Sequence, residues 1–79
     1  MNFIESEWSK PTERMPERSK EDKSRTDLIL FRLNDFYGAP SNLRLGYYDF
    51  NHNMYYCVEG GTVYHPGIVT SWIKLSLIR

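Results

Sequence analysis

The chain has 79 residues, of which 41% are hydrophobic and 15% aromatic, and its ten basic residues balance ten acidic ones. A chain of this length forms at most one domain and buries only about 60–65% of its unfolded surface, so large aromatic side chains must supply much of the core. The balanced charge excludes the long-range positive potential of a typical phosphate-backbone binder and leaves room only for a local basic patch.

The cysteine content and the first residues bear on the compartment. Cys57 is the single cysteine, whereas a secreted domain this small would need several disulfides. The beginning of the chain, MNFIESEW, has neither the basic nor the apolar region of a secretory signal, and no apolar run reaches the roughly 20 residues of a membrane span. We therefore expect a soluble, intracellular protein with no membrane partner.

Residues 1–27 predict a short strand followed by a charged arm. The strand is expected at residues 4–9, with Trp8 as its anchor. Residues 10–25, KPTERMPERSKEDKSR, carry six of the ten basic and four of the ten acidic residues, and Met15 is their only large apolar side chain. Such a segment cannot supply a core, and its two prolines oppose a packed helix. We expect a solvated arm in which residues 17–25 are mobile.

Residues 28–79 predict an antiparallel β body, because short apolar stretches alternate there with turn residues. Four strands are expected, at residues 28–33 (LILFRL), 43–50 (LRLGYYDF), 53–59 (NMYYCVE) and 68–75 (IVTSWIKL). The N-terminal strand would make a fifth. The sequence therefore predicts one all-β domain of four or five antiparallel strands, curved or barrel-like, with a charged N-terminal arm.

Two local patterns refine this β body. Tyr64-His65-Pro66-Gly67 matches a type II turn, in which glycine takes a positive φ. The last strand is expected to alternate regularly, which places Val69, Ser71, Ile73 and Leu75 on one face and Ile68, Thr70, Trp72 and Lys74 on the other.

The segment GYYDFNHNMYY, residues 46–56, predicts a hairpin. A turn centred on Asn51-His52, of two or four residues, pairs Tyr48 with Tyr55 and Tyr47 with Tyr56, each pair on a different face. Cross-strand aromatic pairs stabilise a sheet by roughly 0.2–1 kcal/mol. The tyrosine pair on one face of the hairpin is therefore explained by stability alone. We assign one pair to the core and the other to an exposed surface. The expected core is Trp8, Leu30, Leu45, Tyr47, Tyr56, Val58 and Trp72, and the expected partner-binding residues are Tyr48, Phe50, Tyr55, Arg44, Arg14 and Arg18.

Several short motifs occur in a familiar order: Trp8, ERMPE, LILF, GYYD and VTSWIKL. In this order the chain resembles the small phage and prophage proteins of domain-of-unknown-function family 551. The matching residues are Trp8, Arg14, Met15, Pro16, Glu17, Gly46, Tyr47, Tyr48, Asp49, Val69, Thr70, Trp72 and Leu75. The resemblance implies an origin in a phage or prophage and a site of action in the bacterial cytoplasm. The family supplies no established activity, catalytic residue or cofactor.

Metal and catalytic chemistry find little support in the residues. The candidate metal ligands, Cys57, His52, His65 and Asp49, match no zinc spacing. Cys57, His65 and Asp49 are the residue types of a thiol enzyme, but no nucleophile elbow, glycine-rich phosphate loop or acid pair accompanies them. We expect no enzymatic activity, no metal and no cofactor.

Binding is the function class that the sequence favours. Tyrosine and tryptophan are enriched at interface centres, which predicts a protein that binds a bacterial host protein and modulates or inhibits host physiology or defence. The alternative is a single-stranded nucleic-acid or nucleotide-binding module, in which Tyr48, Phe50 and Tyr55 stack on bases while Arg44 and the arm contact phosphates. Homo-oligomerisation, and a domain whose aromatic residues only form the core, also remain open.

Overall fold

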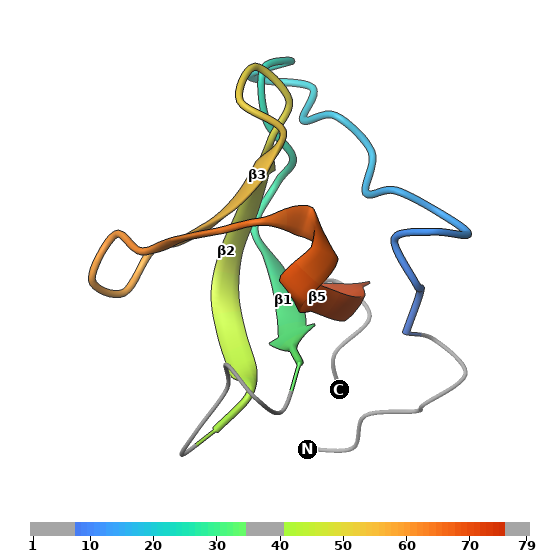
Figure 1. Cartoon of the computed structure of the whole chain (residues 1–79). Helices are drawn as coiled ribbons and strands as arrows, with labels where there is room; N and C mark the ends of the chain where they lie inside the picture. The colour runs from blue at the N-terminus through green and yellow to red at the C-terminus, as the bar shows by residue number, and fades with distance from the viewer. Residues whose placement is uncertain (1–7, 35–40, 76–79) are drawn as a thin grey trace.

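The computed structural model describes residues 8–34 and 41–75. These residues form one antiparallel sheet of five strands in the order β4-β3-β2-β1-β5 (Figure 1). The strands are β1 (Ile29–Leu33), β2 (Leu43–Asp49), β3 (Met54–Cys57), β4 (Val63–Tyr64) and β5 (Val69–Lys74). The all-β prediction is confirmed. The sheet is open and curved, since β4 and β5 lie at opposite edges and do not pair to close a barrel.

Four of the expected strands appear as β1, β2, β3 and β5, and β4 was not expected. The two apolar residues of β4, Val63 and Tyr64, are too few to show a period. The expected N-terminal strand at residues 4–9 lies mostly outside the described residues. Ser9 pairs with Trp72 of β5 through two backbone hydrogen bonds of 2.9 Å. Among the described residues no helix has the length and apolar character needed to cross a membrane.

The connection between β4 and β5 differs from the expected type II turn. Pro66–Ile68 form a single 3-10 turn (η2), and Gly67 does not take the positive φ that a type II turn requires. His65 explains the difference: its Nδ1 accepts a hydrogen bond of 3.1 Å from the Gly67 amide. Its carbonyl accepts one of 2.9 Å from the Ile68 amide. The prediction of a type II turn is therefore wrong.

A register shift breaks the expected alternation of β5. Arg32 of β1 pairs with Ser71, but the next residue, Leu33, pairs with Val69, so Thr70 is the extra residue of a bulge. Val69 therefore joins Trp72 on the buried face. The regular alternation was wrong because a bulge shifts every residue before it to the opposite face.

The core covers one face of the sheet and is built from β1, the Tyr48–Tyr55 pair and β5. Phe31, at its centre, is fully buried, and its ring centroid lies 5.2 Å from that of Tyr55. Phe50, Tyr64 and Ile68 pack around this cluster as partly buried residues. The buried members are Ile29, Phe31, Leu33, Tyr48, Tyr55, Val69 and Trp72.

The described part of the N-terminal segment, residues 8–27, is hydrogen-bonded to the sheet in two places. Near β5, the indole of Trp72 donates a 2.8 Å hydrogen bond to the Arg14 carbonyl. Near the β2–β3 hairpin, residues 18–26 fold back on themselves, and we call them the arm turn. The Thr26 amide donates to the Tyr48 carbonyl, and the Phe50 amide donates to the Ser24 carbonyl.

Thr26 makes the central contact between the arm turn and β2. Its buried hydroxyl accepts a 3.0 Å hydrogen bond from the Tyr48 amide. Ser19, also buried, donates its amide to the Arg25 carbonyl. The arm turn is therefore docked on β2 and not free, although most of its side chains are exposed, as expected for a solvated arm. The amino-acid composition could not predict these contacts, because they are made chiefly by backbone groups and by the small side chains of Thr26 and Ser19.

Candidate interaction surface

The tyrosine hairpin has the expected register. Tyr48 pairs with Tyr55 and Tyr47 with Tyr56, and the turn is the four-residue alternative, residues 50–53. Asn53 closes this turn at a φ of 54°, a left-handed conformation that asparagine tolerates better than most residues. The pairing prediction is confirmed, including the placement of the two pairs on opposite faces.

The assignment of the two tyrosine pairs to core and surface was reversed. Tyr48 is 5% exposed and Tyr55 is 0% exposed, and their rings contact edge to face with centroids 4.8 Å apart. Burial raises the pKa of the Tyr55 hydroxyl, and burial followed by the charge of Asp49 raises that of Tyr48. Their expected role as exposed binding residues is therefore wrong, because Phe31 packs on the Tyr55 ring and Phe50 on the Tyr48 ring within the buried cluster.

The opposite face of the β2–β3–β4 ribbon carries most of the residues expected in the core. Val63 pairs with Tyr56, which pairs in turn with Tyr47. The Val58 amide donates to the Leu45 carbonyl, so Val58 and Leu45 form a second cross-strand pair next to the tyrosine pair. We call this surface the outer face; it comprises Leu43, Leu45, Tyr47, Tyr56, Val58 and Val63.

The outer face is only partly shielded from solvent. Leu43 is 37% exposed, Val58 43% and Val63 48%, while Leu45, Tyr47 and Tyr56 are half-buried. The expected burial of Val58 is therefore wrong, and Leu45 and both tyrosines are not in the main core. The cause is that no described element covers this side of β3 and β4.

The other expected core residues divide in the same way. Trp72 is 2% exposed, as expected. Leu30 pairs with Leu45 and is half-buried on the side of the sheet opposite Phe31. Trp8 is half-buried, and the Arg32 guanidinium lies 4.0 Å from its ring centroid. Trp8 therefore contributes to the packing of the N-terminal segment and not to the main cluster.

Tyr47 and Tyr56 form the aromatic centre of the outer face. Their rings stack with centroids 5.1 Å apart and planes inclined by 28°. The Arg25 guanidinium lies 4.9 Å from the centroid of Tyr47. Arg25 reaches this place because its backbone pairs with Asp49 at the end of β2. The sequence did not single out Arg25, since nothing in the composition of the arm shows where its turn docks.

The expected cationic residues do not gather around one site. The Arg18 guanidinium lies 4.1 Å from the Phe50 ring and donates to the Lys23 carbonyl. Arg44 donates from Nε to the Tyr64 hydroxyl at 3.2 Å. Arg14 pairs with Glu17 at 3.8 Å, with both side chains largely exposed. Phe50 itself packs against Tyr48, so only Arg18 and the three aromatic residues of the proposed set come together.

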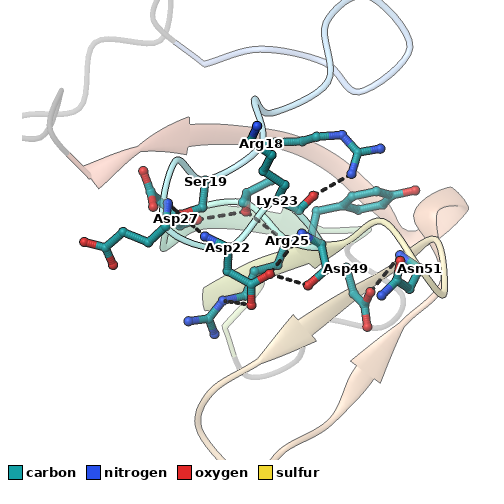
Figure 2. A network of polar contacts seen from close by, with 12 residues as sticks. Arg18, Ser19, Asp22, Lys23, Arg25, Asp27, Asp49 and Asn51 are labelled. Atoms are coloured by element: carbon teal, nitrogen blue, oxygen red, sulfur yellow. Dashed lines mark hydrogen bonds and ion pairs between the residues drawn. The ribbon is translucent and has the colours of Figure 1, made fainter.

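Short-range polar contacts hold the arm turn in shape (Figure 2). The Asp22 carboxylate accepts hydrogen bonds from the Ser24 hydroxyl at 2.6 Å and the Ser24 amide at 3.0 Å. It also lies 3.6 Å from Arg25 Nε. The hydrogen bonds from Ser24, and then the charge of Arg25, lower the pKa of Asp22. These contacts set the direction of the Arg25 side chain toward Tyr47.

The hairpin tip contains a second polar cluster, centred on Asp49. Its Oδ1 accepts hydrogen bonds from the amides of Asn51 and His52, at 2.9 and 3.3 Å. Its Oδ2 lies 2.7 Å from His52 Nδ1. The His52 side chain, and then the backbone amides of the turn, lower the pKa of Asp49. This carboxylate is therefore used to hold the turn.

The residues weighed for metal or thiol chemistry have separate partners. The buried Cys57 thiol donates to the Glu59 carbonyl at 3.2 Å, His65 caps the 3-10 turn, and Asp49 holds the hairpin tip. Within the part of the chain that the structure describes, no group of three or more His, Cys, Asp or Glu side chains is placed to hold a metal ion.

One hollow lies between the arm turn and strands β1 and β5, with a volume of about 740 Å³. Ile29, Leu28 and Trp72 form apolar parts of its wall. Its rim mixes cations and carboxylates, and one of each, Lys74 and Glu17, pair at 3.7 Å. A rim of mixed sign gives this hollow no selectivity for one class of charged ligand.

Comparison with known proteins gives no relative: no family model, curated protein or solved structure matches this chain.

Proposed function

We propose that this protein is a non-enzymatic interaction protein of a phage or prophage, which acts in the bacterial cytoplasm by binding a host protein through the outer face. Its effect is to modulate or inhibit that host protein, and a defence component is one candidate target. The origin and the effect rest on the family resemblance of the sequence. The binding surface rests on one observation: exposed apolar side chains flank a stacked tyrosine pair on a single face of the sheet.

The outer face has the properties of an interface centre. Tyrosine combines a large apolar contact area with a polar hydroxyl, and it is enriched where partners bury the most surface. Tyr47 is held between neighbours, because both the Tyr56 ring and the Arg25 guanidinium contact it. A side chain that is already ordered loses little entropy on binding. Exposed apolar patches of this kind mark interaction sites more often than isolated surface residues do.

Single-stranded nucleic acid is the weaker alternative. Tyr48 and Tyr55, which were expected to stack on bases, are inside the core. Tyr47 is exposed in part, but a base would have to displace Tyr56 or Arg25 from its ring. The chain also has no net charge, so it lacks the strong phosphate attraction that supplies most of the affinity of such proteins.

The test uses lysine substitutions on the outer face. Val63→Lys and Val58→Lys place a charge at side chains that are 48% and 43% exposed, so the fold should persist. Met15→Lys is the matched control, since Met15 is 38% exposed and lies outside the outer face. Tagged proteins would be captured from a phage-permissive bacterium, with and without nuclease, and the bound proteins identified by mass spectrometry.

We expect one defined host protein to bind the wild type and Met15→Lys and to be lost from both outer-face variants. Moderate salt should weaken capture only slightly, because buried apolar contacts are poorly screened. Retention of the same partner by Val63→Lys and Val58→Lys would place binding elsewhere. Capture that disappears with nuclease, falls steeply with salt and is reproduced by single-stranded oligonucleotides would instead support the nucleic-acid alternative.

A further inference from the structure

We propose that the arm turn is a conformational regulator of the outer face. Docked on β2, it holds the Arg25 guanidinium against the Tyr47 ring and orders that ring for binding. Undocked, it releases the ring. The inference rests on the proposed function in that it concerns the same surface. It goes further by naming the segment of the chain that controls this surface and by coupling the docking of that segment to binding.

The arm turn docks on the end of β2 chiefly through backbone groups. The Thr26 amide donates to the Tyr48 carbonyl at 3.0 Å, and the Phe50 amide donates to the Ser24 carbonyl at 2.8 Å. The Tyr48 amide donates to the Thr26 hydroxyl at 3.0 Å. The amides of Tyr48 and Phe50 therefore both have their acceptors in the arm turn, and both lose those acceptors when the turn undocks.

Two arginines of the arm turn reach the two faces of the hairpin. The Arg18 guanidinium lies 4.1 Å from the ring centroid of Phe50, which packs against Tyr48 on the buried face. The Arg25 guanidinium lies 4.9 Å from the ring centroid of Tyr47 on the outer face. Of these two arginines, only Arg25 connects the arm turn to the proposed binding surface.

The position of Arg25 depends on the fold and the docking of the arm turn. Its carbonyl accepts a 2.8 Å hydrogen bond from the Ser19 amide, and its amide donates to the Asp22 carbonyl at 3.3 Å. Its Nε lies 3.6 Å from the Asp22 carboxylate (Figure 2). Its backbone also pairs with that of Asp49 at the end of β2. Undocking breaks the last of these contacts, so Tyr47 then loses its cationic neighbour.

The arm turn is able to undock while the sheet stays folded. Of residues 18–26, only Ser19 and Thr26 are buried, and both have small side chains. Segments that bury little apolar surface open at a lower free energy than the core does. Tyr47 remains paired with Tyr56, because β2 and β3 are joined by their own ladder. Undocking therefore changes the order of the Tyr47 ring and leaves the strands of the outer face in place.

Docking of the arm turn and binding at the outer face are coupled in both directions. A partner that packs on Tyr47 binds more tightly when the ring is already ordered, because less side-chain entropy is lost. By linkage, the bound partner stabilises the docked arm turn by the same factor. A cation–π contact at an exposed site corresponds to a factor of roughly two to five. We therefore expect the undocked protein to bind its partner weaker by about that factor.

The test is a double-mutant cycle followed by amide hydrogen exchange on the purified full chain, with the amides of Tyr48 and Phe50 as reporters. Arg25→Gln should speed their exchange roughly two- to fivefold, because the docked state loses its cation–π contact. In a Tyr47→Leu background the same change should have little effect, since the ring is already absent. In a Tyr47→Phe background, which keeps the ring, it should have the full effect. The exposed ion pair with Asp22 is lost in every background and contributes little.

Two controls separate undocking of the arm turn from a general loss of stability. The Val58 amide donates to the Leu45 carbonyl, away from the arm turn, so its exchange should be the same in Arg25→Gln and in the wild type. Lys20→Gln changes an exposed residue of the arm turn and should leave the exchange of both reporter amides unchanged. Thermal melts establish that each variant is folded.

Two results would overturn the proposal. The first is exchange of the Tyr48 and Phe50 amides that Arg25→Gln leaves unchanged, and the second is an acceleration of equal size in the Tyr47→Leu background. If Tyr47→Leu lacks a melting transition, Arg25→Gln decides alone. Because exchange is measured on the free protein, a failed cycle leaves host capture by the outer face untouched. Failure of host capture would likewise leave the result of the cycle unchanged.

Discussion

Replacing Tyr55 by phenylalanine should stabilise this protein, although Tyr55 lies in the middle of the core. Its side chain is 0% exposed, and its hydroxyl has no hydrogen-bond partner among the described residues. A buried hydroxyl without a partner costs roughly 1–3 kcal/mol. The void left by one oxygen atom, roughly 10 Å³, costs only about 0.2 kcal/mol. We therefore expect Tyr55→Phe to raise the free energy of unfolding by about 1 kcal/mol or more.

Tyr48→Phe is the matched control, because the Tyr48 hydroxyl donates a 3.2 Å hydrogen bond to the Asn53 side chain. Its loss should lower the free energy of unfolding by roughly 0.5–1.5 kcal/mol. Urea and thermal unfolding followed by circular dichroism would separate the two variants, since 1 kcal/mol shifts Tm by about 4–8 °C in a domain of this size. A Tyr55→Phe protein that is less stable than wild type by more than about 1 kcal/mol would refute the reasoning, because the hydroxyl would then have a partner.

The same variant should also change the alkaline limit of stability. Burial raises the pKa of Tyr55 above its usual value of about 10, so the unfolded chain ionises first as the pH rises. Stability that is complete below pH 10 is then lost as the pH climbs toward the folded-state pKa. Tyr55→Phe removes this contribution, and its free energy of unfolding should fall less steeply than that of the wild type above pH 10.

Three further predictions follow from single contacts. Gly46→Ala should lower the free energy of unfolding by more than about 3 kcal/mol or prevent folding, because a Cβ at this position would collide with the Tyr56 carbonyl. Gly67→Ala is the control, since its Cβ would make only ordinary contacts. Thermal melts of the two variants would test this. Thr26→Val should cost roughly 1–3 kcal/mol and speed amide exchange in the arm turn, since it removes the acceptor for a buried β2 amide, while Thr26→Ser should retain most protection. The pKa of Asp49 is lowered, so its contribution to the free energy of unfolding is complete above pH 3.8 and is lost as the pH falls through the folded-state pKa. Asp49→Asn should therefore lose less stability than the wild type between about pH 4 and more acid pH in urea unfolding. An Asp49→Asn protein whose free energy of unfolding falls with acid as steeply as that of the wild type would contradict this role.

The sequence by itself determined the fold class and the pairing of the hairpin. Short apolar runs between turn residues predicted the strands β1, β2, β3 and β5, because the alternation of side chains along a strand depends only on neighbouring residues in the sequence. The register of Tyr47 with Tyr56 and of Tyr48 with Tyr55 followed from the polar turn between them. These features depend on residues close together in the chain, which local patterns can report.

Only the tertiary structure decided which face of the hairpin is buried. Each face carries a tyrosine pair, so the pattern of residues 46–56 is the same whichever side packs inward. The choice was made by distant residues: Phe31 packs on the Tyr55 ring, and Thr26 binds the backbone of Tyr48. The bulge at Thr70 is likewise set by pairing with β1. The predicted burial of the two tyrosine pairs was reversed, because burial depends on which distant segments pack together. The alternation of residues within the hairpin does not contain that information.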